Sequence, residues 1–209
     1  MKSFKKIALL LLLILVIAIL IDKMFEAKAL KDKIDYDKSQ YSLAYFAGGC
    51  FWCVESDFEK YDGVIDAIAG YTGGHQENPT YKQVSSGTSG HIEAVEVVYD
   101  ARIISYEDLL DIFWRHIDPT DKDGQFIDRG YQYSTAIFHT NDDEKTIANQ
   151  SRNYYNETYF NGQIVTQILA LKVFYIAEEY HQDYYLKNPN RYKYYRRNSG
   201  RDSYLNDKW

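Results

Sequence analysis

The most regular alternation of apolar and polar positions lies at 91–99, HIEAVEVVY, and it predicts a strand with one buried face. Other apolar-rich stretches are also predicted to be strands, at 43–47, 64–69, 133–139 and 164–171. A Gly-Gly pair, Gly48 and Gly49, ends the first of them in chain order.

Helical spacing begins directly after the two glycines. Apolar residues recur at i, i+3 and i+7, which predicts a helix over 51–61. Ser105 is a suitable N-cap for a second helix over 106–117. Two more helices are predicted at 141–155 and 175–186. This order of strands and helices predicts an α+β fold, with a mixed sheet covered by helices in a two-layer, elaborated ferredoxin-like arrangement.

Two long polar segments, 71–90 and 118–130, separate predicted elements. Loops of that length in a compact domain are usually functional, so we expect site residues on them. The last segment, 187–209, is basic and aromatic without periodicity, and we expect it to wrap the surface.

The chain begins with a basic stretch, which holds Lys2, Lys5 and Lys6, followed by an uninterrupted apolar run at 7–21. A surface-packed helix would show a polar stripe, and this run has none, so we expect a signal or membrane anchor. The positive residues before it place the remaining chain outside the cytoplasm. We therefore divide the chain into an anchor at 1–29, a tether at 30–41 and one catalytic domain at 42–209.

Charge excludes one class of partner. Residues 1–29 hold five Lys against one Asp and one Glu, so the rest of the chain carries −9 where the whole chain carries −6. An acidic domain is a poor electrostatic match for nucleic acid. Its many aromatic residues, among them 21 Tyr and 10 Phe in the whole chain, are sufficient for a single core.

The only two cysteines, Cys50 and Cys53, lie in the stretch GGCFWC at the predicted start of a helix. Unpaired amides and the helix dipole there favour an anion, so we expect the pKa of the Cys50 thiol to fall. Cys53 lies one turn later and can reach back to form a disulfide. Such a short ring closes too little chain to act as a structural staple.

Other uses of the two thiols remain open at this point. A zinc site needs two further ligands, and the five histidines have no matching pair spacing. A thioredoxin-type oxidoreductase shares the C-x-x-C at a helix start, but Phe51 and Trp52 would crowd a broad protein substrate. A membrane-tethered binding protein without chemistry is a third alternative. The two aromatics suggest instead a wall that holds a small apolar group beside sulfur.

Such a site also needs proton donors, and four residues are candidates. Glu93 shares a strand face with apolar residues, which would raise its pKa and keep it protonated, although a solvated strand glutamate is the common case. Tyr81 lies in the first long polar segment and Tyr133 follows the second, among many other tyrosines. Asp128 is either a turn residue or a hydrogen-bond partner of the site, and spacing alone does not decide.

Several separated motifs in one order resemble the peptide methionine sulfoxide reductase A family. They include GGCFWCVE, GYTGG, the segment 78–100 from NPTY to VVYD, GQFIDRGYQYSTAIF and AEEYHQDYY. The resemblance implies that Cys50 is the nucleophile and that Phe51 and Trp52 enclose the substrate methyl group. It also implies that Glu93 protonates the sulfoxide oxygen. In the same way it assigns hydrogen bonds to that oxygen to Tyr81 and Tyr133, and an orienting role to Asp128.

The resemblance further implies reduction of the S epimer of methionine sulfoxide, free or in proteins, without a metal or organic cofactor. Cys50 would become a sulfenic acid and then a disulfide that an external thioredoxin-like dithiol reduces. Many family members have glycine where Cys53 stands and resolving cysteines near the C-terminus, which this chain lacks. We therefore predict a Cys50–Cys53 disulfide, a monomer, and a membrane-bound or secreted thioredoxin-like donor.

Overall fold

A computed structural model describes residues 36–209. The predicted anchor at 1–29 and the first half of the tether, 30–35, lie outside the described residues. Within 36–209, no helix is both long and apolar enough to cross a membrane. Residues Lys38–Trp209 form one compact unit. The functional division of the chain stays a prediction.

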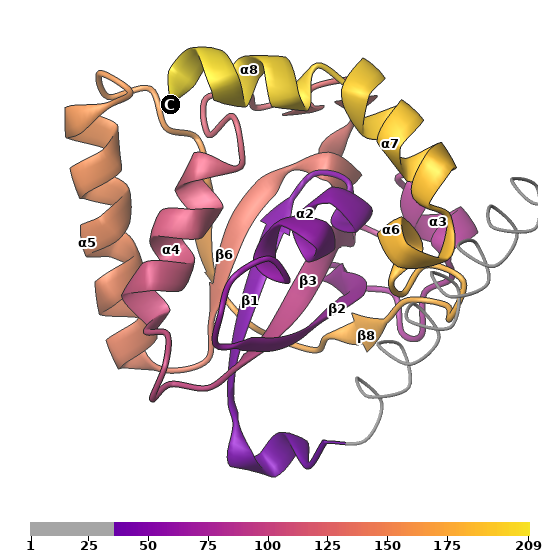
Figure 1. Ribbon diagram of the computed structural model, residues 1–209, viewed down its shortest axis with the longest axis horizontal. Helices are drawn as coiled ribbons and strands as arrows, with labels where there is room; N and C mark the ends of the chain where they lie inside the picture. Colours follow the sequence, from indigo (N-terminus) through magenta and orange to yellow (C-terminus); the bar gives the residue numbers. More distant parts are fainter. Residues whose placement is uncertain (1–35) are drawn as a thin grey trace, which may run out of the picture. The chain divides into compact units, whose positions relative to one another are not determined.

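The described residues contain a six-stranded mixed sheet (Figure 1). In spatial order its strands are β7 (Gln167–Ala170), β6 (Thr135–His139), β1 (Ser42–Gly48), β3 (Ile92–Tyr99), β2 (Val64–Thr72) and β8 (Tyr175–Ile176). All neighbours pair antiparallel except β6 and β7, which are parallel. A separate small sheet pairs β4 (Gly124–Gln125) with β5 (Asp128–Arg129).

The helices complete the expected α+β architecture, which is confirmed. Helix α2 (Phe51–Phe58) connects β1 to β2, and α4 (Tyr106–Arg115) connects β3 to the second half of the chain. The chain order β1-α2-β2-β3-α4-β6, with the spatial order β6-β1-β3-β2, is the split β-α-β arrangement of ferredoxin-like folds. Helix α5 (Asp142–Thr158) follows β6 and packs beside α4 (Figure 1).

The main core lies between the sheet and the helices α2 and α4. Phe46 on β1 is fully buried, and its ring stacks on Phe58 of α2 at 4.9 Å and on Phe113 of α4 at 5.2 Å between centroids. A smaller apolar cluster, which includes Tyr45 and Ala47, lies on the other face of β1. Alternate residues of β1 therefore pack into two separate apolar clusters, one on each face of the sheet.

The predicted helix at 175–186 is wrong. Residues Tyr175 and Ile176 instead form the edge strand β8, and a helix begins only at α6 (Tyr184–Lys187), after Asp183 at φ +52°. The side chain of Gln182 explains the difference, because it exchanges hydrogen bonds of 2.9 Å with the backbone N–H and C=O of Ala69 on β2. Long-range backbone pairing here overrides the local helical pattern.

The tail is also more regular than predicted. It forms α7 (Pro189–Asn198) and α8 (Arg201–Lys208), which are separated by Gly200 in the left-handed region at φ +86°. Pro189 opens α7, a position where its missing N–H costs nothing. Helix α7 buries Tyr192 and Arg196, and α8 buries Arg201, rather than an apolar stripe, so the sequence shows no helical periodicity. The long segment 71–90 contains a further short helix, α3 (Tyr81–Ser85).

Phe46→Ala should lower the free energy of unfolding by about 3–5 kcal/mol, because the cavity lies between two packed layers that cannot collapse. Urea unfolding at neutral pH measures this change. Ile103→Ala is the matched control, since that side chain is 63% exposed and its truncation should change stability by less than about 0.5 kcal/mol. Equal losses in the two variants would contradict the assignment of Phe46 to the core.

Candidate active site

Both thiols lie at the start of α2. Gly49 makes the turn from β1 at φ +81°, and a Cβ there would lie 2.5 Å from Cβ of Gln125. Cys50 then occupies the N-cap position and Cys53 lies on the first turn. Cys50 is 6% exposed, Cys53 is fully buried, and both are free thiols joined by a side-chain hydrogen bond. The turn therefore holds two reactive atoms together, away from bulk water.

Glu93 enters the same space from β3. It is 1% exposed, and its Oε2 accepts a hydrogen bond of 3.0 Å from the backbone N–H of Phe51, the first residue of α2. Burial raises the pKa of Glu93 to about 8, an effect that the Phe51 N–H opposes and the nearby Asp128 carboxyl increases. The carboxyl is thus mostly protonated at neutral pH and can act as an acid, as its apolar neighbours predict.

Two tyrosines lie near Glu93, one from the long segment 71–90 and one from just after the long segment 118–130. Tyr81 begins α3, and Tyr133 ends a short 3-10 helix, Tyr131–Tyr133. Their hydroxyls are hydrogen-bonded to each other. Burial, with Glu93 as the next cause, raises the pKa of Tyr81 to about 12 and also raises the pKa of Tyr133. Both hydroxyls therefore keep their protons and can donate hydrogen bonds.

The pKa of the Cys50 thiol changes in the opposite direction from the one that its position at a helix start predicts. Burial raises the pKa of the Cys50 thiol, and its hydrogen bond with Cys53 and the carboxyls of Glu93 and Asp128 act in the same direction. The pKa of Cys53 is lowered instead, first by the hydrogen bond from Cys50 and then, against burial, by the positive charge of Arg201. The predicted fall of the Cys50 pKa is wrong because burial and the neighbouring Cys53, with a smaller contribution from the carboxyls of Glu93 and Asp128, outweigh the helix terminus.

The two aromatic residues between the thiols have different surroundings. Phe51 is 1% exposed, and its ring lies among those of other buried residues. Trp52 is half-buried and stacks on Tyr184 of α6, with ring centroids 3.7 Å apart and planes 6° apart. The edge of Trp52 also meets the ring of Tyr195 on α7. One aromatic thus forms the base of the site and the other an accessible wall.

His181 is a site residue that the pattern of the chain does not single out, although it lies in the motif AEEYHQDYY. Its Nδ1 accepts a hydrogen bond of 3.1 Å from the indole N–H of Trp52, so its Nε2 carries the proton. Burial lowers the pKa of His181 to about 4, which keeps the ring neutral. Tyr195 is likewise new to the site, and its hydroxyl donates to Oδ2 of Asp128.

The structure brings all the predicted site residues to one end of the sheet. Those joined directly to one another are Cys50 with Cys53, Phe51 with Glu93, and Tyr81 with Tyr133. Trp52 and Asp128 are fixed by residues after 180. A model of the family described as peptide methionine sulfoxide reductase matches residues 42–209. The chain belongs to this family.

Individual members of the family are similar in sequence to this chain over most of its length. A peptide methionine sulfoxide reductase MsrA of Bacillus licheniformis is 50% identical over 168 residues, which are 80% of this chain and 93% of that protein. An MsrA/MsrB protein of Vibrio cholerae is 48% identical over 192 residues, 91% of this chain. The chain spans about half of that relative, 51% of its length.

Solved structures show the same fold. Reduced Mxr1 from Saccharomyces cerevisiae, 33% identical, superposes with a TM-score of 0.70 over 74% of this chain and 90% of that one. Mxr1 has also been solved in complex with Trx2, and that chain matches with a TM-score of 0.51 and 26% identity over 72% of this chain and 88% of its own.

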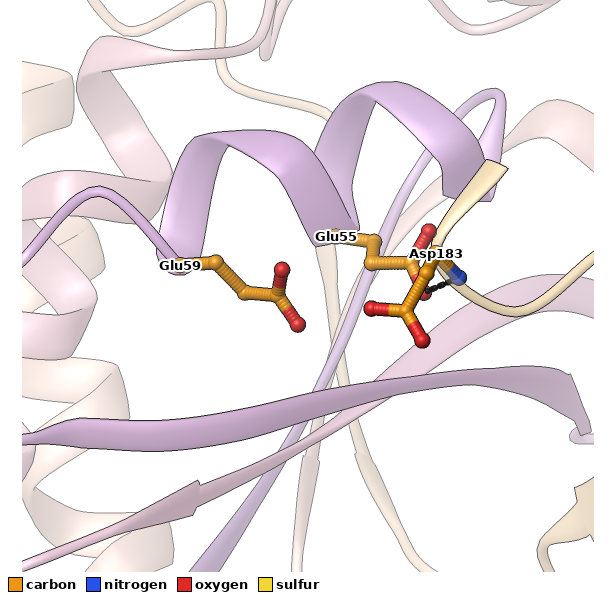
Figure 2. Close-up of side chains that lie close together, drawn as sticks. All are labelled: Glu55, Glu59 and Asp183. Carbon is orange, nitrogen blue, oxygen red and sulfur yellow. Dashed lines mark hydrogen bonds between the residues drawn. The ribbon is translucent and has the colours of Figure 1, made fainter. Parts of the chain in front are cut away.

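A separate group of carboxylates in the reductase lies outside the thiol site. Ligand atoms of Glu55, Glu59 and Asp183 lie within 4.8 Å of one another (Figure 2). Oε1 of Glu55 accepts a hydrogen bond of 2.7 Å from the backbone N–H of Asp183. Glu59 accepts hydrogen bonds from the hydroxyl of Tyr185 and the N–H of Ala67. These carboxylates join α2 to the segment before α6, and we assign no metal to them.

Burial of Glu93 makes the stability of the reductase depend on pH. The folded protein holds this proton up to about pH 8, while the unfolded chain releases it near 4.5, so this contribution to stability is lost as pH rises through that window. Glu93→Gln should remove the dependence. The unfolding free energy of Glu93→Gln, relative to that of the wild type, should therefore increase with pH, by on the order of 4 kcal/mol in total.

Urea unfolding of both proteins between pH 5 and about 9 measures this difference. Glu77→Gln, which changes an exposed carboxyl, should leave the wild-type curve unchanged. Parallel curves for wild type and Glu93→Gln would contradict the raised pKa.

Proposed function

We propose that this reductase converts the S epimer of methionine sulfoxide, free or in oxidised proteins, to methionine, with Cys50 as the nucleophile. One observation carries the proposal. The buried Cys50 thiol shares its site with a protonated carboxyl, Glu93, and with the donor hydroxyls of Tyr81 and Tyr133. A nucleophile beside three proton-bearing groups suits a substrate whose oxygen must gain protons as it leaves sulfur.

The first step oxidises one thiol. The Cys50 sulfur attacks the sulfoxide sulfur while Glu93 transfers its proton to the oxygen, and the two tyrosine hydroxyls stabilise the developing charge. The hydroxyl group then passes from the substrate sulfur to the Cys50 sulfur as the transient S–S bond breaks, and the Cys50 proton replaces the one that Glu93 gave up. Methionine leaves, and Cys50 remains as a sulfenic acid. The low water content of this buried site protects the sulfenic acid from side reactions.

The second step joins the two thiols. Cys53 is hydrogen-bonded to Cys50 on the same turn, so its sulfur can attack the Cys50 sulfenic acid without any movement of a distant segment. Water leaves and a Cys50–Cys53 disulfide remains. This disulfide is the oxidised form of the C-x-x-C variant and marks one completed turnover.

Recognition of the substrate falls to the aromatic wall. The indole of Trp52, stacked on Tyr184 and oriented by His181, forms an apolar surface beside the thiol that accepts the methyl group next to sulfur. Phe51 closes the base of this surface. Asp128, held by Tyr195, lies near enough to Cys50 to affect its charge and orients the bound substrate.

An external dithiol completes the cycle by reducing the disulfide, and no metal or organic cofactor takes part. The complex of Mxr1 with Trx2 supports a thioredoxin-like donor. The apolar run at 7–21 and its preceding lysines support an anchored or secreted catalytic domain outside the cytoplasm, active as a monomer. The donor is then a membrane-bound or secreted thioredoxin-like protein.

A single turnover without added reductant tests this function. Mixed with each epimer of a methionine sulfoxide peptide, the reduced enzyme should form one equivalent of methionine from the S epimer only and lose both thiols. Cys53→Ser should still form one methionine but stop with a sulfenic acid that a dimedone-type reagent traps, because no second thiol can condense. Cys50→Ser should form none. Methionine from Cys50→Ser, or none from wild type, would contradict the proposal.

Glu93→Gln should lower kcat/KM about 100-fold or more, because an amide cannot deliver a proton to the sulfoxide oxygen. In the wild type, the rate should fall above about pH 8 as Glu93 ionises, and the variant should lack this fall. Rates of methionine formation from pH 6 to about 9 measure both effects. Glu96→Gln, on the opposite face of the same strand, should keep the wild-type profile.

A further inference from the structure

The segment that follows β8 is fixed to a single residue of β2 at both of its ends. At one end, the backbone N–H of Ala177 donates a hydrogen bond of 2.9 Å to the C=O of Ala69. At the other end, the side-chain amide of Gln182 bonds to the N–H and the C=O of the same residue, each at 2.9 Å. Gln182 also donates to the C=O of Ala177 at 2.9 Å, which closes the loop. Residues 177–182 are therefore held in one position relative to β2.

This closed loop carries Glu178, whose carboxylate connects two elements of the site. Its Oε1 accepts a hydrogen bond of 2.8 Å from the backbone N–H of Tyr81, the first residue of α3. Its Oε2 accepts one of 2.8 Å from the hydroxyl of Tyr71 on β2, a side chain that is fully buried. Burial disfavours the charge on Glu178, but the hydrogen bonds that it accepts, first among them the one from Tyr81, lower its pKa below the ordinary value. The carboxylate is thus ionised at neutral pH and accepts at both oxygens.

Helix α3 depends on this carboxylate at its first residue. It has five residues, too few for a helix that is stable by itself. Its local capping contact joins the N–H of Thr80 to the side chain of Gln83 at 2.9 Å and does not involve the N–H of Tyr81. An amide at a helix start needs an acceptor from outside the helix, and Glu178 supplies it. Val84 anchors the far end of α3 in the core, so Glu178 fixes the end that carries Tyr81.

The position of this first residue decides where the Tyr81 hydroxyl lies. That hydroxyl is hydrogen-bonded to the hydroxyl of Tyr133. The Tyr81 ring packs between Phe51 and His181, with centroids 6.3 Å and 4.3 Å away. Because His181 belongs to the same closed loop as Glu178, this loop contacts both the backbone and the ring of Tyr81.

We propose that Glu178 is a positioning residue of the reductase, which holds the Tyr81 hydroxyl within reach of the sulfoxide oxygen. This inference rests on the proposed function, in which Tyr81 and Tyr133 donate to that oxygen. Tyr133 lies on a different segment, where its backbone N–H bonds to the C=O of Gly130 at 3.0 Å, and does not need Glu178. The effect of Glu178 on the rate therefore passes through Tyr81.

Kinetics in two tyrosine backgrounds test this inference. Two hydroxyls that donate to one oxygen can replace each other in part, so each background leaves a single hydroxyl donor. In Tyr133→Phe, where Tyr81 is that donor, Glu178→Ala should lower kcat/KM about tenfold or more, with the loss in kcat. In Tyr81→Phe, the same substitution should change kcat/KM by less than about twofold, because no hydroxyl is left to position.

Three further variants separate position from charge and from folding. Glu178→Gln keeps an acceptor oxygen for the Tyr81 N–H and should retain most of the rate. Glu179→Gln, the matched control, removes an adjacent exposed carboxylate and should change nothing. Tyr71→Phe removes one of the two groups that hold the Glu178 carboxylate, and should lower the rate by a smaller factor while Tyr81 is the donor. This variant also covers the case in which Glu178→Ala does not fold.

Amide hydrogen exchange in the full chain supplies a readout without turnover. The N–H of Tyr81 should exchange about tenfold faster in Glu178→Ala than in the wild type, because its acceptor is gone. Glu178→Gln and Glu179→Gln should keep the wild-type protection. Lack of methionine formation by the wild type would refute the proposed function, and the exchange rates would still decide whether Glu178 fixes the start of α3.

Two results would overturn the inference about Glu178. One is an equal loss of kcat/KM for Glu178→Ala in the Tyr133→Phe and Tyr81→Phe backgrounds, since a general packing defect does not depend on which hydroxyl remains. The other is an unchanged exchange rate of the Tyr81 N–H in Glu178→Ala.

Discussion

The hydrogen bond from the backbone N–H of Phe51 to the carboxyl of Glu93 is the interaction on which the site depends. It joins the first residue of α2 to β3, so the turn with both thiols and the strand with the acid cannot shift independently. It also sets the balance at Glu93, because this N–H favours the carboxylate while burial favours the acid. Burial is the larger effect, and the result is a proton donor that is kept in place by a backbone amide.

Burial is the main reason why reasoning from the helix terminus alone fails for Cys50, and the same bond adds to it. A thiol at an N-cap gains acidity from the free amides of the first turn. Here the amide of Phe51 is already occupied by Glu93, and the bond brings an acidic group toward the sulfur. Helix α2 is also short, at 8 residues, so little dipole remains to oppose burial.

The sequence pattern correctly predicted those helices and strands whose limits are set by residues close to them in sequence. The alternation at 92–99 became β3, and the Ser105 hydroxyl accepts the N–H of Asp108 at 3.1 Å as its N-cap position predicts. The segment after 174 was mispredicted because its conformation is fixed from elsewhere. Gln182 satisfies the backbone of Ala69, which is far away in sequence, and no pattern within a window of the chain contains that information.

The position of Cys53 also explains why the C-terminus can be a fixed structure. In the proposed reaction both thiols lie on one helical turn, so no distant segment has to carry a second thiol to Cys50. The residues after 187 can then form the fixed helices α7 and α8 and bury charged side chains. Burying a charge costs desolvation free energy, and only partners held in fixed positions can offset that cost. Arg196 and Arg201 offset part of that cost through hydrogen bonds to Asp57 and to the carbonyls of Gly48 and His116.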